Sequence, residues 1–251
     1  MLPDGMGWWE AFLLSGQAWR QYQGWGFALG GPWHLVCLVL CGALIIYLVK
    51  KYVHMSVGGT SRRRMLLVMG IMPQVSLGLT QYLTMTQGLY GPVSPPLYLC
   101  NFSEIFVLAD VVYPNMLCDE CSFALGFVGG VCALTFPGWI QCPIWSLPSI
   151  ASFFEHSLLV AFPMVRIASK EFTPDIRHAW MPMVVGASYL LAIMPYNLRF
   201  HSNFGFVPDP MGAEPLEYFY QAIGNPGYTI GVFAFGVVVV LSEYIPFVIK
   251  R

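Results

Sequence analysis

The chain has 251 residues, of which 57% are hydrophobic and only 10% are charged, and its formal net charge is −1. Soluble domains carry about 25% charged residues, so this composition excludes a soluble globular protein. It predicts an all-α fold, a polytopic bundle of membrane-spanning helices. Electrostatic binding of nucleic acid needs a basic patch. The one short basic cluster, at Arg62-Arg63-Arg64, is too small for that, so no nucleic-acid partner is expected.

We expect no signal peptide at the start of the chain, because Asp4 and Glu10 precede any basic residue and polar residues interrupt the apolar stretch. The segment is rich in tryptophan, with Trp8, Trp9, Trp19 and Trp25. Such a segment is typical of a helix that lies in the membrane–water interface. We therefore predict an interfacial segment over residues 1–31 and a single transmembrane domain over residues 32–251.

About seven hydrophobic stretches follow that are long enough, at about 20 residues each, to approach a membrane crossing. The predicted spans are Trp33–Tyr52, Met65–Leu89, Pro96–Tyr113, Ser122–Phe136, Ser149–Ile167, Ala179–Pro195 and Tyr228–Ile249. We expect the fourth of these spans to be the short one. The sequence thus predicts a bundle of about seven transmembrane helices.

The distribution of lysine and arginine predicts how these spans are oriented. If seven spans alternate, all but two of the 12 basic residues fall on one side of the membrane, and the exceptions are Arg20 and Arg199. Cytoplasmic loops carry the excess of Lys and Arg. We therefore predict an N-terminus outside and a C-terminus in the cytoplasm, in the plasma membrane if the chain is bacterial.

Polar residues inside the spans are informative, because a charged side chain in a bilayer costs about 2.5 kcal/mol or more. Several lie in or beside the outer third of the predicted bundle: His34, Gln81, Cys100, Asn101, Glu104, His156, Asn197 and Asn203. At a rise of about 1.5 Å per residue, Cys100 lies on the order of 5 Å below the outer surface and His156 on the order of 10 Å. These residues predict a functional polar pocket at that depth.

The chemistry expected of this pocket is nucleophilic. A histidine can take the proton of a nearby cysteine and so activate it, which makes Cys100 and His156 candidate catalytic residues. Glu104 or Asn101 is a candidate to orient the imidazole. The side-chain amide of Asn197 or Asn101 is a candidate to stabilise an oxyanion. The expected reaction is acyl transfer through a thioester, with membrane lipids as partners and either a hydroxyl group or water as acceptor.

The chain has neither the G-x-S-x-G motif of serine hydrolases nor the H-E-x-x-H motif of zinc peptidases. Neither a cofactor nor a metal ion is expected. The "CDEC" segment, with Cys118 and Cys121, has the spacing of half a zinc site but no second half. We predict it to be a cytoplasmic turn with reduced thiols. Two other function classes stay open: a transporter or channel lined by Glu104, Asp110 and His156, and a sensor that binds a lipid without turning it over.

Several segments, taken in order, resemble a known family: "GPWHLV", "PPLYLCNFSE", "LTFPGW", "FFEHSLL", "YNLRFHSNFGFVPDP" and "GNPGYTIGVFAF". They are similar to the YwaF-type integral membrane proteins, whose eukaryotic branch is transmembrane protein 164. The resemblance implies a phospholipid acyltransferase that uses a Cys and a His in adjacent membrane helices, and these roles fall on Cys100 and His156. The chain departs from the family at Tyr98, where bacterial members usually have His, and at Gln81, where an acidic residue is frequent.

Overall fold

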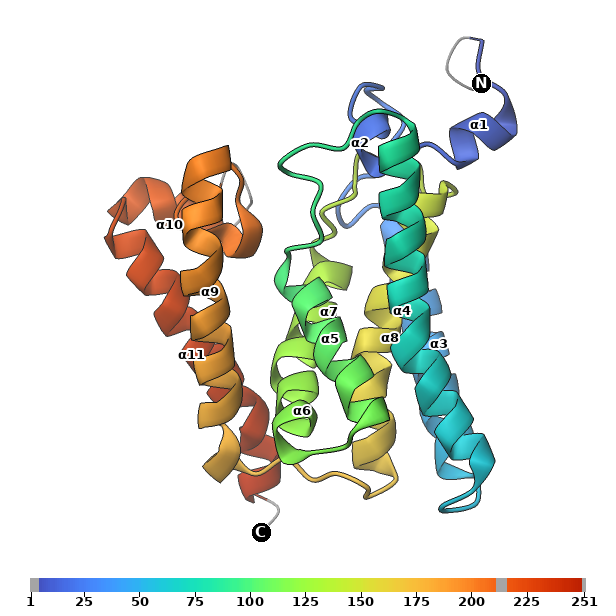
Figure 1. Ribbon diagram of the computed structural model, residues 1–251, viewed down its shortest axis with the longest axis vertical. Helices are drawn as coiled ribbons and strands as arrows, with labels where there is room; N and C mark the ends of the chain where they lie inside the picture. Colours follow the sequence, from blue (N-terminus) through green and yellow to red (C-terminus); the bar gives the residue numbers. More distant parts are fainter. Residues whose placement is uncertain (1–4, 211–215, 250–251) are drawn as a thin grey trace.

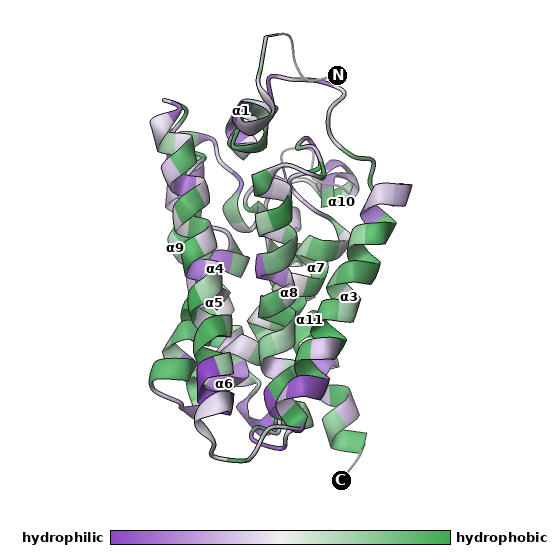
Figure 2. Cartoon of the chain, turned by 90° about the vertical axis from the view of Figure 1, so that its right-hand side faces the viewer, coloured by the Kyte–Doolittle hydropathy of each residue, from purple (hydrophilic) through white to green (hydrophobic). Residues whose placement is uncertain are grey.

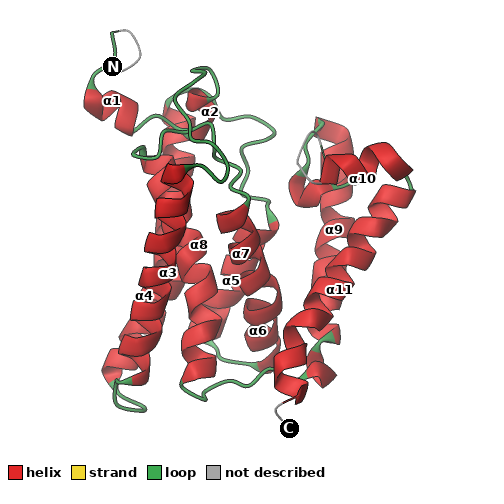
Figure 3. Ribbon diagram, turned by 180° about the vertical axis from the view of Figure 1, so that it is seen from behind, coloured by secondary structure: helices red, strands yellow, loops and turns green. Residues whose placement is uncertain are grey.

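The computed structural model describes residues 5–210 and 216–249, and within these ranges the chain consists of helices and loops (Figure 3). Six stretches are helical, long and apolar enough to cross a membrane. They are α3 (Pro32–Val53), α4 (Thr60–Thr86), the continuous helix Met116–Thr135, α8 (Leu147–Ala168), the stretch Ile176–Phe200 that ends in α9 (Trp180–Phe200), and α11 (Gly227–Ile249). Together with the shorter α5 (Leu99–Val112), they confirm the predicted all-α bundle of about seven helices.

The fourth span was predicted to be the short one, but the shortest of the seven helices is the third, α5. α5 has 14 residues and so a length of about 21 Å. It begins at Leu99, after the extended residue Tyr98 and a tight turn in which the N–H of Leu97 donates to the carbonyl oxygen of Pro95 at 2.8 Å. It ends at Val112 because Tyr113, the residue before Pro114, is also non-helical.

The fourth span is longer than predicted because it starts before its apolar stretch does. α6 (Met116–Cys121), the π-helical segment η1 (Ser122–Phe127) and α7 (Val128–Thr135) form one helix of 20 residues. Its first turns carry Asp119 and Glu120, whose side chains are paired inside the protein with Arg166 and Tyr244. The "CDEC" segment therefore lies in α6 and not in the predicted turn.

The centre of the bundle is α8, which contacts α3, α4, α5, η1 and α7. In the most apolar 18-residue part of α8, 67% of the residues are buried, compared with 11% in the corresponding parts of α3 and α11. A helix that is surrounded by others exposes little surface to lipid, whereas α3 and α11 present apolar side chains outward. Residues of α8 are thus positioned to meet side chains from several other helices.

On one side of this centre, α9 and α11 form an outer pair with the short α10 (Leu216–Ile223) between them in the chain (Figure 1). α9 reaches the start of α5 through aromatic contacts. The hydroxyl of Tyr189 donates to the carbonyl oxygen of Leu97 at 2.7 Å, and its ring stacks on Phe102 with centroids 5.2 Å apart. These contacts fix the segment that leads into α5.

The N-terminal segment forms two short helices, α1 (Trp8–Phe12) and α2 (Gly16–Trp19), in place of the single helix predicted. Trp19 is fully buried and packs with Cys142, in the loop before α8. The side chain of Gln87, just after α4, accepts from the N–H of Ser15 at 2.9 Å and donates to the carbonyl oxygen of Leu13 at 3.0 Å. The segment is therefore attached to two parts of the bundle, while its assignment to the interface stays a prediction.

The predicted basic face corresponds to one end of the bundle, where α3 ends, α4 begins and α8 ends (Figure 1). Figure 2 shows hydrophilic residues gathered at this end, around α6 and the neighbouring loops. There the guanidinium of Arg62 pairs with Glu171 at 2.6 Å. Helix α1 and the last turn of α11 lie at opposite ends, as an odd number of crossings requires. Lys250 and Arg251 lie outside the described residues, and the direction of the chain through the membrane stays a prediction.

Candidate active site

Cys100 is the second residue of α5, and not a full turn inside the helix as the predicted span implied. The first N–H group of this helix with a backbone partner is that of Phe102, which donates to the carbonyl oxygen of Tyr98 at 3.1 Å. The N–H groups before it have no intrahelical acceptor. Those of Cys100 and Asn101 interact with the sulfur atom of Cys100. A helix N-terminus favours negative charge, on a thiolate or on a substrate oxygen.

Two glycines of α7 bring this cysteine and the predicted histidine to the same turn. A Cβ atom on Gly129 would lie 3.9 Å from the Cα of Cys100, and one on Gly130 would lie 3.1 Å from the carbonyl oxygen of His156. Neighbouring positions of a helix point about 100° apart, so one turn of α7 contacts both helices. α5 and α8 also contact each other directly. The structure therefore places Cys100 and His156 on helices that flank a single glycine pair.

This close approach predicts a difference between two adjacent substitutions. In Gly130→Ala the new methyl group would lie 2.7 Å from Cγ2 of Val160, a stiff β-branched side chain, and 3.1 Å from backbone. We expect a loss of about 1–3 kcal/mol in the free energy of unfolding. Gly129→Ala is the matched control, because its nearest contact is an ordinary 3.9 Å. Unfolding in detergent, followed by circular dichroism, should show a lower midpoint for Gly130→Ala alone. Equal midpoints would contradict the close packing of α7 on α8.

The imidazole of His156 is buried and held in one orientation. Its Nδ1 atom lies 2.7 Å from the carbonyl oxygen of Ser152, one turn earlier in α8. A carbonyl oxygen only accepts hydrogen bonds, so Nδ1 carries a proton, and in the neutral ring Nε2 keeps its lone pair. The ring of Trp139 stacks on the imidazole with centroids 5.1 Å apart. The ring of His156 is thus held by Ser152 and Trp139, and its neutral form presents Nε2 as a base.

No hydrogen bond joins His156 to Cys100, to Glu104 or to Asn101 within the described part of the chain. Hydrogen bonds between catalytic groups are frequently long or absent in a substrate-free enzyme and tighten only when substrate binds. The pairing of Cys100 with His156 therefore stays a prediction, and so does a role of Glu104 or Asn101 toward the imidazole.

Two buried carboxyl groups lie near the sulfur atom of Cys100. Glu104 and Glu155 interact electrostatically with each other and with Cys100. Within the described residues, neither oxygen of Glu104 has a hydrogen-bond partner, and Oε1 of Glu155 has none. Asn101 lies close to Glu104 without a hydrogen bond of ordinary geometry. Glu155 was not among the predicted site residues, although a carboxyl group inside an apolar span was the signal that could have identified it.

Of the other predicted site residues, His34 forms hydrogen bonds with the backbone through both ring nitrogens. Its Nδ1 accepts from the N–H of Gly30 at 3.0 Å, and its Nε2 donates to the carbonyl oxygen of Leu134 at 2.9 Å. Both ring nitrogens are therefore used, and the side chain ties α3 to the end of α7. Gln81 lies half-buried on α4, and its Oε1 has no partner among the described residues.

Asn197, in the last turn of α9, and Asn203, in the loop after it, organise that loop. The side-chain NH₂ of Asn197 donates to the carbonyl oxygens of Phe204 and Val207, at 2.8 and 2.6 Å. That of Asn203 donates to the carbonyl oxygen of Pro210 at 3.1 Å. Both amide hydrogens of Asn197 are thus engaged, which leaves none for an oxyanion. The backbone amides at the start of α5 are the better donors for that role.

All seven cysteines are free thiols. Cys142 is fully buried against Trp19, and burial raises the pKa of its thiol to about 12. Within the described residues, no three His, Cys, Asp or Glu side chains come together as metal ligands do. Cys118 and Cys121 in α6 are both buried.

The comparison with protein families identifies the family of the chain. A model described as the TMEM164 family matches residues 28–244, a range that includes every helix from α3 to the last turns of α11. Comparisons with curated proteins and with solved structures gave no match. The match covers most of the chain and both Cys100 and His156. The protein is therefore an integral membrane protein and belongs to the TMEM164 family.

Proposed function

We propose that the protein is a membrane acyltransferase, or a hydrolase of lipid esters, that forms an acyl-thioester on Cys100. The observation that carries this proposal is the placement of Cys100 and His156 on either side of the Gly129–Gly130 turn. A thiol at a helix N-terminus and a neutral imidazole with a free Nε2 are the two groups that thioester chemistry needs.

In the proposed reaction, Nε2 of His156 takes the proton of the Cys100 thiol while the sulfur atom attacks the carbonyl carbon of a lipid ester. The N–H groups of Cys100 and Asn101 stabilise the oxyanion that forms. When the carbon–oxygen bond breaks, the leaving alkoxide takes the proton back from His156, and the acyl chain remains on sulfur. A hydroxyl acceptor or water then gives its proton to His156, attacks the thioester and releases the thiol.

The surroundings of Cys100 explain why a base is required at that position. Glu104 and Glu155 lie close enough to act electrostatically on its sulfur atom. Negative charge on either carboxyl group, when it is ionised, would disfavour a free thiolate. A thiol that loses its proton only as it attacks avoids this cost, and His156 supplies the site for that proton.

Membrane lipids are the proposed partners, because Cys100 lies in the first turn of a helix at the predicted outer surface. At about 1.5 Å per residue, such a residue lies only a few ångströms below the headgroups, where the ester bonds of lipids lie. The plasma membrane is the proposed location if the chain is bacterial. The acyl donor and the acceptor are left open.

Covalent capture of the intermediate tests the proposal. Protein in vesicles of dioleoylphosphatidylcholine and dioleoylphosphatidylglycerol should gain the mass of one oleoyl group, and neutral hydroxylamine should remove it. Cys132→Ala, which changes an exposed cysteine of α7, should keep the adduct. Cys100→Ala should lose it. An adduct that persists in Cys100→Ala, or a wild-type protein that never forms one, would overturn the proposal.

One observation favours a second candidate, a transporter of protons or small cations. The unpartnered carboxyl oxygens of Glu104 and Glu155 lie inside the helix bundle, where such groups are costly. Flux measured in vesicles discriminates between the two functions. A transporter would keep its flux in Cys100→Ala and lose it in Glu104→Gln, whereas the proposed enzyme has no flux to lose.

A further inference from the structure

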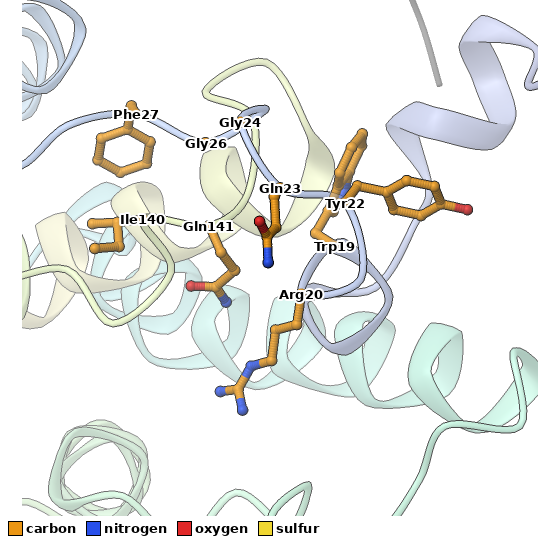
Figure 4. Close-up of a pocket in the computed structure, with 9 residues that line it drawn as sticks. All are labelled: Trp19, Arg20, Tyr22, Gln23, Gly24, Gly26, Phe27, Ile140 and Gln141. Atoms are coloured by element: carbon orange, nitrogen blue, oxygen red, sulfur yellow. The ribbon is translucent and has the colours of Figure 1, made fainter. Parts of the chain in front are cut away.

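A hollow of about 410 Å³ lies where the N-terminal segment meets the loop between α7 and α8 (Figure 4). One wall comes from α2 and the residues that follow it, and the other from Ile140 and Gln141. α2 contacts α4 and lies at the end of the bundle where α4 ends, beyond the start of α5 (Figure 1). The hollow was not predicted from the sequence.

The two walls are held together by backbone contacts. The N–H of Phe27 donates to the carbonyl oxygen of Ile140 at 2.9 Å. A Cβ atom on Gly26 would lie only 2.0 Å from that same oxygen, so only glycine fits there. Below the hollow, the fully buried Trp19 anchors α2 against Cys142. The hollow is therefore a fixed part of the structure.

Its polar lining includes the side chains of Arg20, Gln23 and Gln141, together with Tyr22. Figure 4 shows the amide groups of the two glutamines turned toward one another and the Arg20 side chain extending past them. The guanidinium of Arg20 makes no ion pair with any carboxylate of the described residues. A guanidinium is always charged and presents five N–H donors that match the oxygens of a phosphate. The glutamine amides add neutral donors beside it.

The position of Arg20 connects the hollow to the candidate active site. Tyr98, the residue just before α5, lies within electrostatic reach of both the Arg20 guanidinium and the Cys100 thiol. Arg20 is also one of the two basic residues on the predicted outer face. In a glycerophospholipid the phosphate lies a few bonds from the ester carbonyls, so one lipid molecule has both the group that Arg20 would bind and the ester that Cys100 would attack.

We propose that Arg20, together with Gln23 and Gln141, binds the phosphate of a phospholipid headgroup. The position of the bound ester at Cys100 rests on the function proposed above, whereas the headgroup site itself does not. A lipid headgroup and free phosphate share this chemistry, and the experiment below separates them.

Calorimetric titration of the full chain in dodecyl maltoside tests this site without any turnover. All variants carry Cys100→Ala, so binding is measured whether or not Cys100 is a nucleophile. With dihexanoylphosphatidylglycerol as the probe, Arg20→Gln should raise the Kd about tenfold or more, as the loss of a charge-assisted contact does. Arg20→Lys should fall between this variant and the parent. The matched control is Arg199→Gln, which removes the other basic residue of that face and should leave the Kd unchanged.

Two further probes complete the test. Dihexanoylglycerol, which has the same chains and no phosphate, should bind equally to the parent and to Arg20→Gln. Equal Kd values for Arg20→Gln and Arg199→Gln with the phospholipid would overturn the site. Inorganic phosphate binding as tightly as the phospholipid would identify the free ion as the occupant and overturn the headgroup assignment. Arg20-dependent binding in a protein that forms no thioester would leave the headgroup site in place and reject the proposed function.

Discussion

Replacing Cys100 or His156 with alanine is expected to lower lipid acyl transfer by about 10³-fold or more, and the double variant should be no slower than the worse single one. A nucleophile and its base act as a unit, so removing the second residue should cause no further loss of rate once the first is gone. The measurement is transfer of a labelled oleoyl group between lipids in vesicles that contain the purified protein.

Matched controls separate this loss from damage to the fold. His54→Ala removes an exposed histidine of the α3 end, whose Nδ1 lies 2.7 Å from the carbonyl oxygen of Lys50, the same one-turn contact that His156 makes. Cys132→Ala removes an exposed cysteine. Both controls should transfer at the wild-type rate. Losses in the two single variants that multiply in the double variant would show that Cys100 and His156 act independently, and the proposed pair would be wrong.

Replacing Arg166 with methionine is expected to destabilise the protein by about 3–5 kcal/mol, the cost of leaving buried charges without their partner. The guanidinium of Arg166, on α8, pairs with both Asp110 of α5 and Asp119 of α6. Asp110 is fully buried at its side chain, and its second oxygen has no partner among the described residues. The measurement is the midpoint of thermal unfolding in detergent, followed by size-exclusion chromatography of heated samples.

Two comparisons test the cause of this effect. Arg63→Met changes an exposed arginine at the same end of the bundle and should leave the midpoint unchanged. Adding Asp110→Asn and Asp119→Asn to Arg166→Met removes the orphaned charges and should recover much of the loss. If the triple variant were no more stable than Arg166→Met, the ion cluster would not be the source of the stability.

The helices themselves were largely predictable, because long apolar runs in a chain with 10% charge have few alternatives to membrane spans. The errors arose where a helix end is set by something other than hydropathy. α5 starts at Leu99, after a tight turn at Pro95–Leu97 and the extended residue Tyr98. α6 extends the fourth span backward because Asp119 and Glu120 find partners on other helices. Those partners are distant in the sequence and cannot be read from a local window.

The residues of the candidate site were chosen from the sequence, and their role stays a prediction, whereas their geometry could not be predicted. Cys100 and His156 were identified as exceptions in apolar spans, and their depth followed from the predicted direction of the helices. The glycine pair that places their helices on either side of α7 depends on three helices packing together. The structural roles of His34 and Asn197 could not be predicted either, since their hydrogen-bond partners are set by the folded loops.

The attachment of the N-terminal segment to Gln87 has a consequence for how this part of the chain tolerates change. Both bonds made by that amide go to main-chain atoms, of Leu13 and Ser15, so neither bond depends on the identity of those two side chains. The Ser15 hydroxyl has a separate role, because it caps α2 by accepting from the N–H of Ala18 at 3.2 Å. A single replacement at Gln87 releases two anchors at once. A change of the Leu13 side chain should therefore leave the attachment in place, whereas a change at Gln87 loosens the segment that carries Arg20.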